Sequence, residues 1–553
     1  MRYLRLFYCL LSVFPLIGNG QNTDSSAPYN RGKILYLQHC FVCHQLNGQG
    51  IPNTYPPLAQ SDFLNADKKR SIRILCEGQG GIITVNGKQY EGTMPAMVLR
   101  DQEVADVLTY VHNSWGNTNG PILSEEVREV RKTTAYSTFE QLAAVSAYPP
   151  IPKAPAGLKI RELVKLPING VRLASDGKGK SLFVLSGSGD VHRVDIASGL
   201  VKPLIVARDY LVKKVGDIGG PVMVTGMTVD KQRRLYTVIN QQNNATLPVQ
   251  NFVTVYRSTS FNPAGDPIDL KPWFTTNYPG NSSYLHAAEH IAFGPDGFVY
   301  ISNGARTDGN EANGDTNYYQ KGETEITACI WRLDPRQTPP TMEVYARGIR
   351  NAYGFTWSPK GEMFATENGP DAPAPEELNL IEKGKHYGFP YRFADWTKKA
   401  YNHTPEPPAG MEFTLPIPNM GPDGGFMGSS ISSFDPHSCP GGIVWLSDDF
   451  PEPYRDTMLL TRFGNFIREP RDAGFDILQV RLKKNSTAQY ESEVRSFLAP
   501  LGRPVDIHQS GKGSLYILEY SRPTTPALSY SMPGRIVEIK VATTGGAGGV
   551  PPK

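Results

Sequence analysis

The chain has 553 residues and a nearly balanced charge, with 56 lysines and arginines against 53 aspartates and glutamates. This balance, without a basic run or stripe, argues against a nucleic-acid binder, and the length is enough for two or three domains. Glycine (54 residues), proline (46) and the aromatic residues (10%) are spread evenly, which is typical of a turn-rich β protein.

Residues 1–20 have the pattern of a secretory signal peptide. Arg2 and Arg5 precede an apolar run from Leu6 to Ile17, and small residues follow the run. An uncleaved membrane anchor is the alternative, but the run is too short to span a bilayer comfortably. We therefore expect a periplasmic or otherwise exported protein with no membrane span in its mature form.

The segment CFVCH, residues 40–44, has the spacing of a covalent haem c site. Residues three and four positions apart lie on one face of a helix. Cys40 and Cys43 can therefore both bond the edge of one porphyrin while His44 binds its iron. A redox C-x-x-C or half of a zinc site needs no adjacent histidine, and the sequence holds no second C-x-x-C.

The sixth ligand of such an iron should be a soft thioether or a second imidazole. The segment EGTMPAM offers Met94 and Met97. We prefer Met94, because the fixed backbone of Pro95 stiffens the loop that carries it. Met97 is the alternative, and ordinary core packing remains the other explanation for either side chain.

Residues 28–116 as a whole resemble a small class I cytochrome c domain. Apolar residues recur at helical spacing from Val104 to Val111, which predicts an amphipathic closing helix. The segments YPPLAQSDFL and GGIITVNGKQYEGTMPAM are similar to the haem-lining segments of that family. The sequence thus predicts a small all-α electron-transfer domain at the start of the mature chain.

Residues 117–155 are the expected linker, polar at first and then proline-rich, which makes a semi-rigid connector. Within it, the segment SEEVREVRK suggests a short charged helix. Three cysteines lie outside the signal peptide and the haem site, namely Cys76, Cys329 and Cys439. An odd number spread over two domains does not indicate a disulfide framework, so we expect buried free thiols.

Residues 156–541 show a weak internal repeat, and residues 542–553 form a short tail. A turn with glycine or aspartate leads into a strand rich in β-branched and aromatic residues six times, starting at residues 175, 229, 294, 358, 447 and 510. Propeller blades repeat on about this scale. We therefore predict an all-β six-bladed propeller; a pair of β-sandwiches is the alternative.

Several propeller segments resemble the soluble quinoprotein glucose and sorbosone dehydrogenases, six-bladed propellers that bind pyrroloquinoline quinone (PQQ). The segments are HAAEHIAFGPDGFVYISNG, GIRNAYGF and ENGPDAPAPEELNLIEKGKHYGFP. The resemblance implies that His286 is the catalytic histidine and that Arg350 and Asn351 form the family's Arg-Asn pair. It also implies that the carbonyl groups of Gly369 and Pro370 bind a calcium ion that touches PQQ.

The same resemblance places Arg462 and Arg503 against the cofactor. These residue types suit the chemistry, because an imidazole can take a hydroxyl proton near neutral pH and arginine holds the carboxylates of PQQ well. A hard Ca²⁺ ion can polarise the quinone oxygens. The chain departs from the family pattern at Leu285, Pro221 and Val505, and the resemblance is weakest at Arg462.

The segment DGNEANGDTN, residues 308–317, is rich in oxygen ligands, but it lacks the spacing of an EF-hand. A second calcium site is therefore the less favoured interpretation, and we expect a solvated loop.

Together these features predict an exported quinohaemoprotein. The propeller would oxidise a sugar or another polyol at PQQ with the help of His286 and Arg350. The electrons would pass to the haem c of the same chain, then to an external acceptor such as a respiratory cytochrome or oxidase. The alternative is an electron-transfer cytochrome fused to a non-catalytic propeller that binds carbohydrate or protein.

Overall fold

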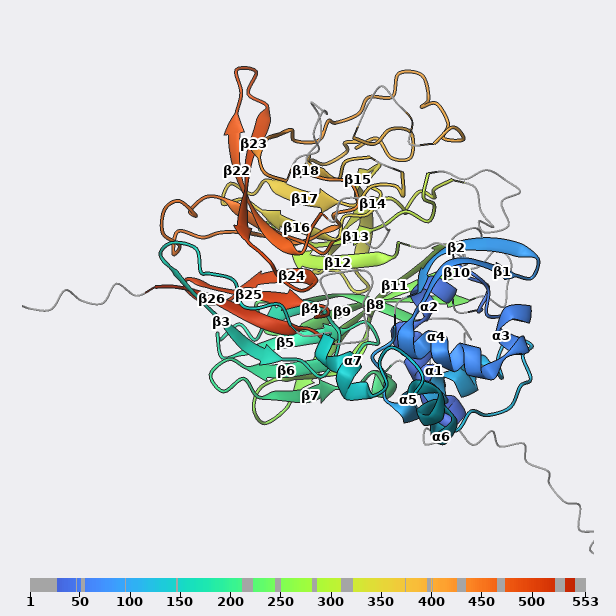
Figure 1. The fold of residues 1–553 in the computed structure, drawn as a ribbon. Coiled ribbons are helices and arrows are strands. Elements are labelled where there is room, and N and C mark those ends of the chain that lie inside the picture. The colour runs from blue at the N-terminus through green and yellow to red at the C-terminus, as the bar shows by residue number, and fades with distance from the viewer. Residues whose placement is uncertain are drawn as a thin grey trace, which may run out of the picture.

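The computed structural model describes residues 27–45, 47–50, 55–94, 96–145, 148–210, 222–243, 250–280, 286–309, 322–372, 374–394, 399, 401–424, 434–464, 473–522 and 533–542. A small helical domain lies beside a large ring of β-sheets (Figure 1). The predicted signal peptide, Pro95, Pro221, Leu285 and nearly all of the tail lie outside the described residues. Within them, no helix is long and apolar enough to cross a membrane.

The helical domain contains five helices and one hairpin before the linker. These are α1 (Pro28–His39), α2 (Phe41–His44), α3 (Asp62–Ala66), α4 (Lys68–Glu77), β1 (Gln79–Val85), β2 (Lys88–Met94) and α5 (Asp101–Val111). The hairpin was not predicted. Asp67 is the N-cap of α4, and its side chain accepts hydrogen bonds from two backbone amides of the first turn of the helix.

The first and last helices of this domain cross at a glycine. A Cβ atom on Gly32 of α1 would lie 1.9 Å from the carbonyl oxygen of Asp106 on α5, so only glycine allows this approach. Beside the crossing, Nε of Arg31 lies 2.6 Å from the carboxylate of Asp106. The crossing brings both helices to one apolar core.

The first half of the predicted linker packs onto the helical domain. The predicted charged helix is α6 (Ser124–Arg131), and a further short helix follows as α7 (Phe139–Val145). Val127 and Val130 of α6 join the core of the domain. Arg131 is almost fully buried and donates hydrogen bonds to Asp101 (2.7 Å) and to the carbonyl oxygen of Leu99 (2.8 Å).

The ring consists of six sheets, so the predicted six-bladed propeller following a small helical domain is confirmed. The first three blades are β4 (Gly170–Ser175) to β7 (Val201–Ile205), β8 (Val222–Val229) to β11 (Pro267–Pro279), and β12 (Ala288–Phe293) to β15 (Thr341–Arg347), with the short helix α8 (Ala207–Tyr210) after β7. The fourth runs from β16 (Gly354–Trp357) through β17 (Met363–Glu367) to β18 (Glu377–Ile381).

The remaining strands of the ring are as follows, in chain order: β5 (Ser181–Ser186), β6 (Val191–Asp195), β9 (Leu235–Asn243), β10 (Gln250–Phe261), β13 (Val299–Asn303), β14 (Cys329–Asp334), β19 (Asn419–Pro422), β20 (Pro440–Trp445), β21 (Met458–Arg462), β22 (Asp476–Lys484), β23 (Tyr490–Leu498), β24 (Pro504–Gln509), β25 (Ser514–Glu519) and β26 (Arg535–Val541). Blade five has the order β19-β23-β22-β21-β20.

The last blade joins the two ends of the propeller. Its order is β24-β25-β26-β3, where β3 (Leu158–Lys165) precedes all the other blades in the chain. Leu158 pairs with Val541 and Lys165 with Arg535 in an antiparallel ladder. This pairing of the first strand of the propeller with its last strand closes the ring.

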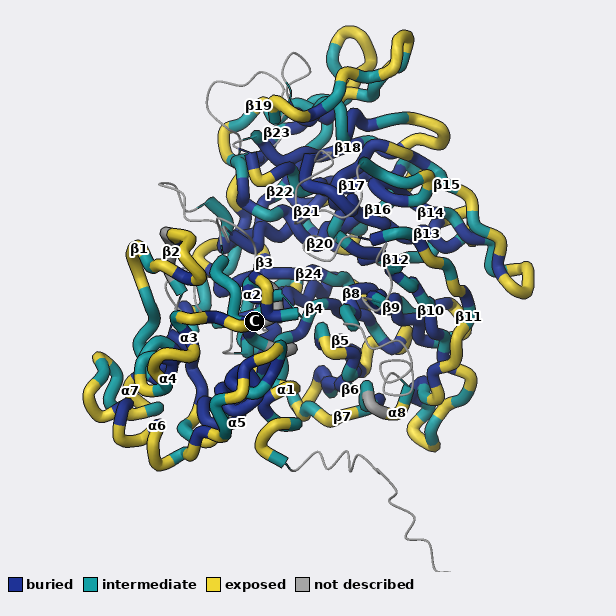
Figure 2. The backbone as a smooth tube through the Cα atoms, turned by 90° about the vertical axis from the view of Figure 1, so that its right-hand side faces the viewer, coloured by how far each residue is buried: buried dark blue, intermediate teal, exposed yellow. Residues whose placement is uncertain are grey.

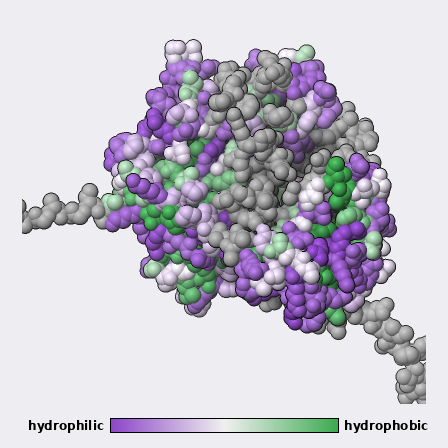
Figure 3. Space-filling model, in the orientation of Figure 1, coloured by the Kyte–Doolittle hydropathy of each residue, from purple (hydrophilic) through white to green (hydrophobic). Residues whose placement is uncertain are grey.

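Each predicted repeat covers the turn and the second strand of the innermost hairpin of one blade, from β4–β5 in the first to β24–β25 in the sixth. The inner strands of the blades are β4, β8, β12, β16, β20 and β24. Of these, β4 packs beside β8, β8 beside β12, β16 beside β20, β20 beside β24, and β24 beside β4. Figure 2 shows these inner strands mostly in the buried colour. On the face drawn in Figure 3, hydrophobic side chains form small separate patches among hydrophilic ones.

Candidate functional site

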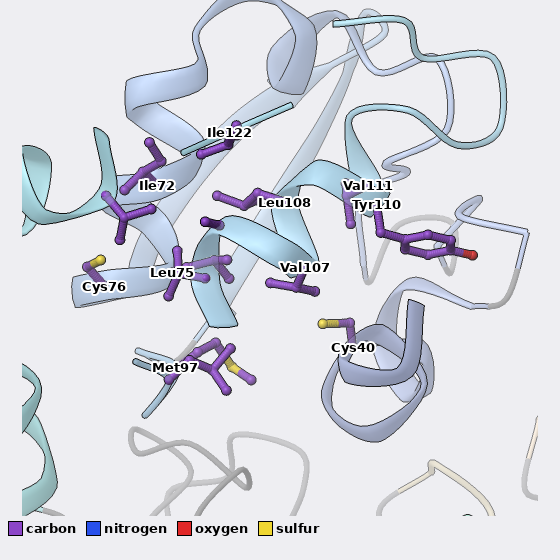
Figure 4. Close-up of a cluster of buried hydrophobic side chains, with 14 of the residues drawn as sticks. Cys40, Ile72, Leu75, Cys76, Met97, Val107, Leu108, Tyr110, Val111 and Ile122 are labelled. Atoms are coloured by element: carbon purple, nitrogen blue, oxygen red, sulfur yellow. The ribbon is translucent and has the colours of Figure 1, made fainter. Parts of the chain in front are cut away.

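The haem-binding residues predicted from the sequence line one cavity of the helical domain. Its volume is about 200 Å³, and Cys40, Cys43, His44, Met94 and Met97 all lie in its wall. Most of the remaining wall is apolar. Figure 4 shows the sulfur of Cys40 directed toward Val107 of α5, with Met97 on another side of the same space.

His44 is held in the orientation that iron binding requires. Its Nδ1 atom lies 3.1 Å from the carbonyl oxygen of Pro56, to which Nδ1–H can donate. That bond leaves the lone pair of Nε2 for a metal, as in other metal-binding histidines. Burial lowers the pKa of His44, so the imidazole stays neutral and able to bind. The donor set of two thiols, one imidazole and a thioether therefore fits haem c.

Both candidate methionines reach this cavity, from different local structures. Met94 ends β2, pairs with Gln79 and is partly buried. Met97 belongs to the core of the domain, and its backbone N–H donates to the carbonyl oxygen of Leu75 at 2.8 Å. Both thioethers therefore remain available as the sixth ligand, and Met94 stays our prediction.

The propeller brings His286 and Asn351 together. His286 stands just before β12, and its Nδ1 atom lies 3.1 Å from Nδ2 of Asn351. The backbone N–H of His286 donates to the carbonyl oxygen of Ala305 (3.1 Å), and the N–H of Ala305 donates to that of Arg350 (2.7 Å). A Cβ atom on Gly304 would lie 2.4 Å from Cβ of His286, so glycine makes room for the histidine.

Arg350 points its guanidinium into a set of oxygen atoms. Its Nη2 lies 2.5 Å from Oδ1 of Asp308, and its Nη1 donates to the carbonyl oxygen of Asn368 at 3.1 Å. Its backbone N–H donates to the buried Glu367 at 2.5 Å. Burial, and next the positive charge of Arg350, lower the pKa of His286 well below its usual range. The histidine is therefore a neutral base at neutral pH.

The chemistry of a base at His286 depends on how the amide of Asn351 is turned. If Nδ1–H donates to the amide oxygen, the lone pair of Nε2 is available to take a proton. With the amide nitrogen toward the ring, Nδ1 accepts and Nε2 carries the hydrogen. Oδ1 of Asn351 is buried and, among the residues that the structure describes, has no hydrogen-bond partner. If the amide is turned, its oxygen accepts a hydrogen bond from Nδ1–H of His286. The lone pair of the histidine is then on Nε2, where it can take a proton.

The predicted calcium ligands lie on a backbone loop organised by a buried acid. The N–H of Gly369 donates to the carboxylate of Glu376, and burial raises the pKa of Glu376 to about 7. Carbonyl oxygens such as those of Gly369 and Pro370 suit a hard cation. In the described part of the chain, no cluster of three or more His, Cys, Asp or Glu side chains could hold a metal.

Arg462 is already engaged by two carboxylates. Its Nε and Nη2 lie 2.9 and 2.6 Å from the two carboxylate oxygens of Asp476, and its Nη1 lies 3.1 Å from Asp435. These bonds satisfy the fork of the guanidinium and fix it between β21 and β22. Arg462 stays a prediction as a clamp for the cofactor, and it would have to share its guanidinium with Asp476 and Asp435.

Arg503 is fully buried and nearer to the site. Its guanidinium carbon lies 5.0 Å from the centre of the Phe463 ring and 4.8 Å from that of Phe475. Burial and the negative charges of Glu376 and Asp371 raise the pKa of the Cys439 thiol, and the positive charges of Arg503 and Arg350 oppose them. Arg503 and Arg350 therefore lie near a common region around Cys439, in which carboxylates are also present.

The sequence did not predict the role of two residues of the site. Asp308 begins the segment 308–317, for which we preferred a solvated loop to a calcium site, but Asp308 is only 7% exposed and binds Arg350. Residues 310–317 lie outside the described residues. The hydroxyl of Tyr401 donates to the second carboxylate oxygen of Asp308. Tyr401 lies in the long loop after blade four, so only the folded chain brings it to Arg350.

Comparison with known proteins identifies both parts of the chain. A family model described as glucose/sorbosone dehydrogenase matches residues 175–524, and a cytochrome c model matches residues 29–115. Cytochrome c-552 of Thermus thermophilus is 38% identical over 110 residues, which cover 18% of this chain and 83% of that protein. Quinoprotein glucose dehydrogenase B of Acinetobacter calcoaceticus is 24% identical over 231 residues, covering 37% of this chain and 46% of that protein.

Solved structures give a more distant likeness. The PQQ-bound aldose sugar dehydrogenase of Streptomyces coelicolor is 18% identical, with a TM-score of 0.47, and the match covers 70% of this chain and 99% of that one. The soluble aldose sugar dehydrogenase of Escherichia coli, in its apo form, is 15% identical, with a TM-score of 0.48 and 70% and 100% coverage.

Proposed function

The chain belongs to the glucose/sorbosone dehydrogenase family and carries a cytochrome c domain, and from this premise we propose that it is an exported quinohaemoprotein. In this proposal the propeller oxidises a sugar or another polyol at PQQ. The haem c of the helical domain receives the electrons and passes them to an external acceptor, such as a respiratory cytochrome or oxidase.

The pairing of His286 with Asn351, beside Arg350, is the observation that carries this proposal. A neutral imidazole that is oriented by an amide can take the proton of a substrate hydroxyl. Bound PQQ would accept the hydride from the same carbon atom. Arg350 and Arg503 supply positive charge for its carboxylates, and Gly369 and Pro370 supply carbonyl groups for calcium.

Fusion of the two domains would favour the transfer of electrons from the propeller to the haem. Tethering replaces a diffusional encounter between dehydrogenase and cytochrome with an intramolecular one and so raises the effective concentration. The helix α6 packs on the helical domain, and Nη2 of Arg535 donates to the carbonyl oxygen of Pro149 at 2.8 Å. Both ends of the linker are thus attached, one to each domain.

Reconstitution tests the proposal directly. The full-length protein with its haem is mixed with PQQ and Ca²⁺, a panel of aldoses and polyols is added, and haem reduction is followed in the visible spectrum. We expect reduction only when PQQ, Ca²⁺ and a substrate are all present. The His286→Asn variant should lose it, whereas His192→Asn, on β6 of the first blade, should keep it. Absence of haem reduction with every substrate would refute the proposal.

One observation favours a different function. Arg350 is paired with Asp308, and Arg462 with Asp476 and Asp435, so two of the three arginines assigned to PQQ already have carboxylate partners. A non-catalytic propeller that binds carbohydrate or protein, fused to an electron-transfer cytochrome, would need no cofactor clamp. Uptake of PQQ by the protein, measured by mass spectrometry under native conditions, separates the two functions.

A further inference from the structure

The inner strands of the propeller carry polar side chains at β-bulges. The bulges fall between Gly170 and Arg172 on β4, between Val224 and Gly226 on β8, between Ala288 and Ile291 on β12, and between Pro504 and Asp506 on β24. A bulge bends a strand and re-aims its side chains, and bulges are common next to active sites. We call Arg172, Glu289, His290, Asp506 and His508 the axial cluster.

Arg172 is the centre of the axial cluster. It is 1% exposed, and its Nε donates to the carbonyl oxygen of Thr225 at 2.9 Å. Its Nη1 lies 3.7 Å from Oδ1 of Asp506, and its guanidinium carbon lies 3.8 Å from the centre of the Tyr353 ring. Strands β4, β8 and β24 and the segment before β16 therefore all meet at this one side chain.

The cluster contains several buried polar atoms that lack a partner. Within the described residues, no hydrogen bond satisfies Nη1 of Arg172, Oε2 of Glu289, Nδ1 of His290 or Nε2 of His508. A buried polar group that stays unsatisfied lowers the stability of the fold. Ordered water is the usual partner of buried polar groups in proteins. A cluster that contains both donors and acceptors is suited to binding ordered water molecules.

These water molecules would begin at the catalytic site. The buried oxygen of Asn351, the partner of His286, also lacks a hydrogen-bond partner among the described residues. Glu289 is three residues after His286 and 6% exposed. The charges of both Arg172 and Arg350 act on its carboxyl group, so Glu289 is the member of the axial cluster that is near both Arg172 and the arginine of the site.

We propose that Glu289 is a proton relay, which takes the substrate-derived proton from His286 through ordered water and releases it along the axial cluster. This inference rests on the proposed function. Oxidation of a CH–OH group to C=O yields two electrons and two protons, and the haem iron takes only the electrons. Two protons must therefore leave the propeller in each turnover, at least one of them from His286.

The charges around Glu289 keep it suited to this task. Burial raises its pKa to about 7, while the positive charges of Arg172 and Arg350 act against the rise. Tyr353 faces it from the segment before β16, β8 contributes the uncharged Thr225 and Gly226, and β24 adds Asp506 and His508 beyond Arg172. A carboxyl group that titrates near neutral pH can both accept and release a proton there.

Stopped-flow measurements with a pH-indicator dye test the relay in the reconstituted protein. Haem absorbance reports electrons, and the dye reports protons that reach the solvent. In the parent protein, proton release should keep pace with haem reduction. In Glu289→Gln, proton release should lag and steady-state turnover should fall by roughly tenfold or more. Glu289→Asp, which keeps an acid, should recover part of the rate.

Two controls keep the inference separate from the proposed function. Glu538→Gln removes another buried carboxylate, on β26 away from the axis, and should leave proton release unchanged. Infrared titration of the full chain without PQQ should show carboxylic-acid absorption that titrates near neutral pH. Glu376 and Glu377 contribute to this absorption as well, so the parent-minus-variant difference spectrum should show that Glu289→Gln loses one component of it. If the parent reduces its haem with sugar while Glu289→Gln releases protons equally fast, the relay is wrong; if the parent never reduces its haem, the proposed function is wrong.

Should Glu289→Gln fail to fold, the infrared band remains informative through His508→Asn, which alters the far part of the axial cluster. The band should persist in that variant, but proton release should slow. Unchanged proton release in His508→Asn would overturn the proposed proton route through ordered water in the axial cluster.

Discussion

The side-chain amide of Asn351 lies 3.1 Å from Nδ1 of His286 and so determines which ring nitrogen can act as a base. We expect Asn351→Ala to lower the rate of haem reduction by sugar roughly 10- to 100-fold, because a positioned base contributes about 10²–10⁴-fold and orientation is part of that effect. Asn351→Asp should retain more activity than the alanine variant, since its carboxylate can only accept from Nδ1–H.

Single-turnover haem reduction in the reconstituted protein measures this effect. Asn277→Ala, on the outer strand β11, is the matched control and should behave like the parent. Equal rates in Asn351→Ala and in the parent would show that the amide does not orient the base.

The pH dependence of the chemical step should reflect the depressed pKa of His286. Because burial and Arg350 hold that pKa well below its usual value, the histidine stays neutral, and single-turnover rates should be flat between about pH 8 and pH 6.5. Replacing Arg350 with glutamine removes a positive charge and should raise the pKa, so the acidic decline should move to higher pH. A decline that begins at the same pH in both proteins would argue against His286 as the base.

Tyr401 should support PQQ binding through Arg350. Its hydroxyl donates to Asp308, whose other carboxylate oxygen holds Arg350 at 2.5 Å. Loss of one hydrogen bond to a charged group costs about 1.5–3 kcal/mol at most in a buried site. We therefore expect Tyr401→Phe to raise the PQQ concentration needed for half-maximal reconstitution by up to about 10- to 150-fold, with a smaller effect on kcat. Tyr391→Phe, in the same loop, serves as the control, and a fall in kcat alone would contradict this role.

Local features of the sequence predicted the blades, but not how the ring closes. Each of the six repeats places a turn signal and a strand within one hairpin, so neighbouring residues suffice to identify it. The pairing of β3 with β26 joins residues at opposite ends of the propeller, such as Leu158 and Val541. No local turn or periodicity encodes that contact, and it emerges only when the full ring forms.

In the candidate site, too, local segments of the sequence predicted some residues, whereas others depend on tertiary contacts. His286, Arg350 and Asn351 lie in segments that resemble the family, and the fold brings them together. The partners of Arg350 were missed, because Asp308 and Tyr401 come from two different loops. Arg462 was assigned by position in a weakly matching segment, and only the structure places Asp476 and Asp435 against it. Charge partners of this kind depend on tertiary contacts.

Replacement of Met94 should separate the two candidate ligands of the haem iron. If Met94 is the sixth ligand, Met94→Ala should lower the haem reduction potential by on the order of 0.1–0.3 V, within the ~0.8 V range that axial ligands span. Met97→Ala should leave the potential nearly unchanged but lower the free energy of unfolding by about 2–5 kcal/mol, because it empties a core position. Spectroelectrochemical titration and urea unfolding measure the two effects, and the reverse pattern would make Met97 the ligand.

A buried pair of carboxyl groups, one of which accepts a hydrogen bond from the backbone N–H of Arg350, should make the propeller less stable at high pH. Glu367 and Glu377 face each other on β17 and β18, and the amide of Asn379 donates to both at 2.9 Å. Burial raises the pKa of Glu377 to about 7 and that of Glu367 well above its usual value. The folded state thus binds a proton more tightly than the unfolded chain, so the free energy of unfolding falls as pH rises from about 4.5 to about 7.

Glu377→Gln should therefore stabilise the propeller at about pH 8, by on the order of 1–3 kcal/mol, and have little effect at about pH 5. At the higher pH the substitution removes a buried negative charge, whereas at the lower pH it replaces a carboxyl group that is already neutral. Urea unfolding followed by tryptophan fluorescence at both pH values measures the difference. Glu493→Gln, on the exposed surface of β23, is the control and should not reproduce this pH dependence. A Glu377→Gln variant that is destabilised equally at both pH values would show that the carboxylate is stabilised in the fold rather than forced to take up a proton.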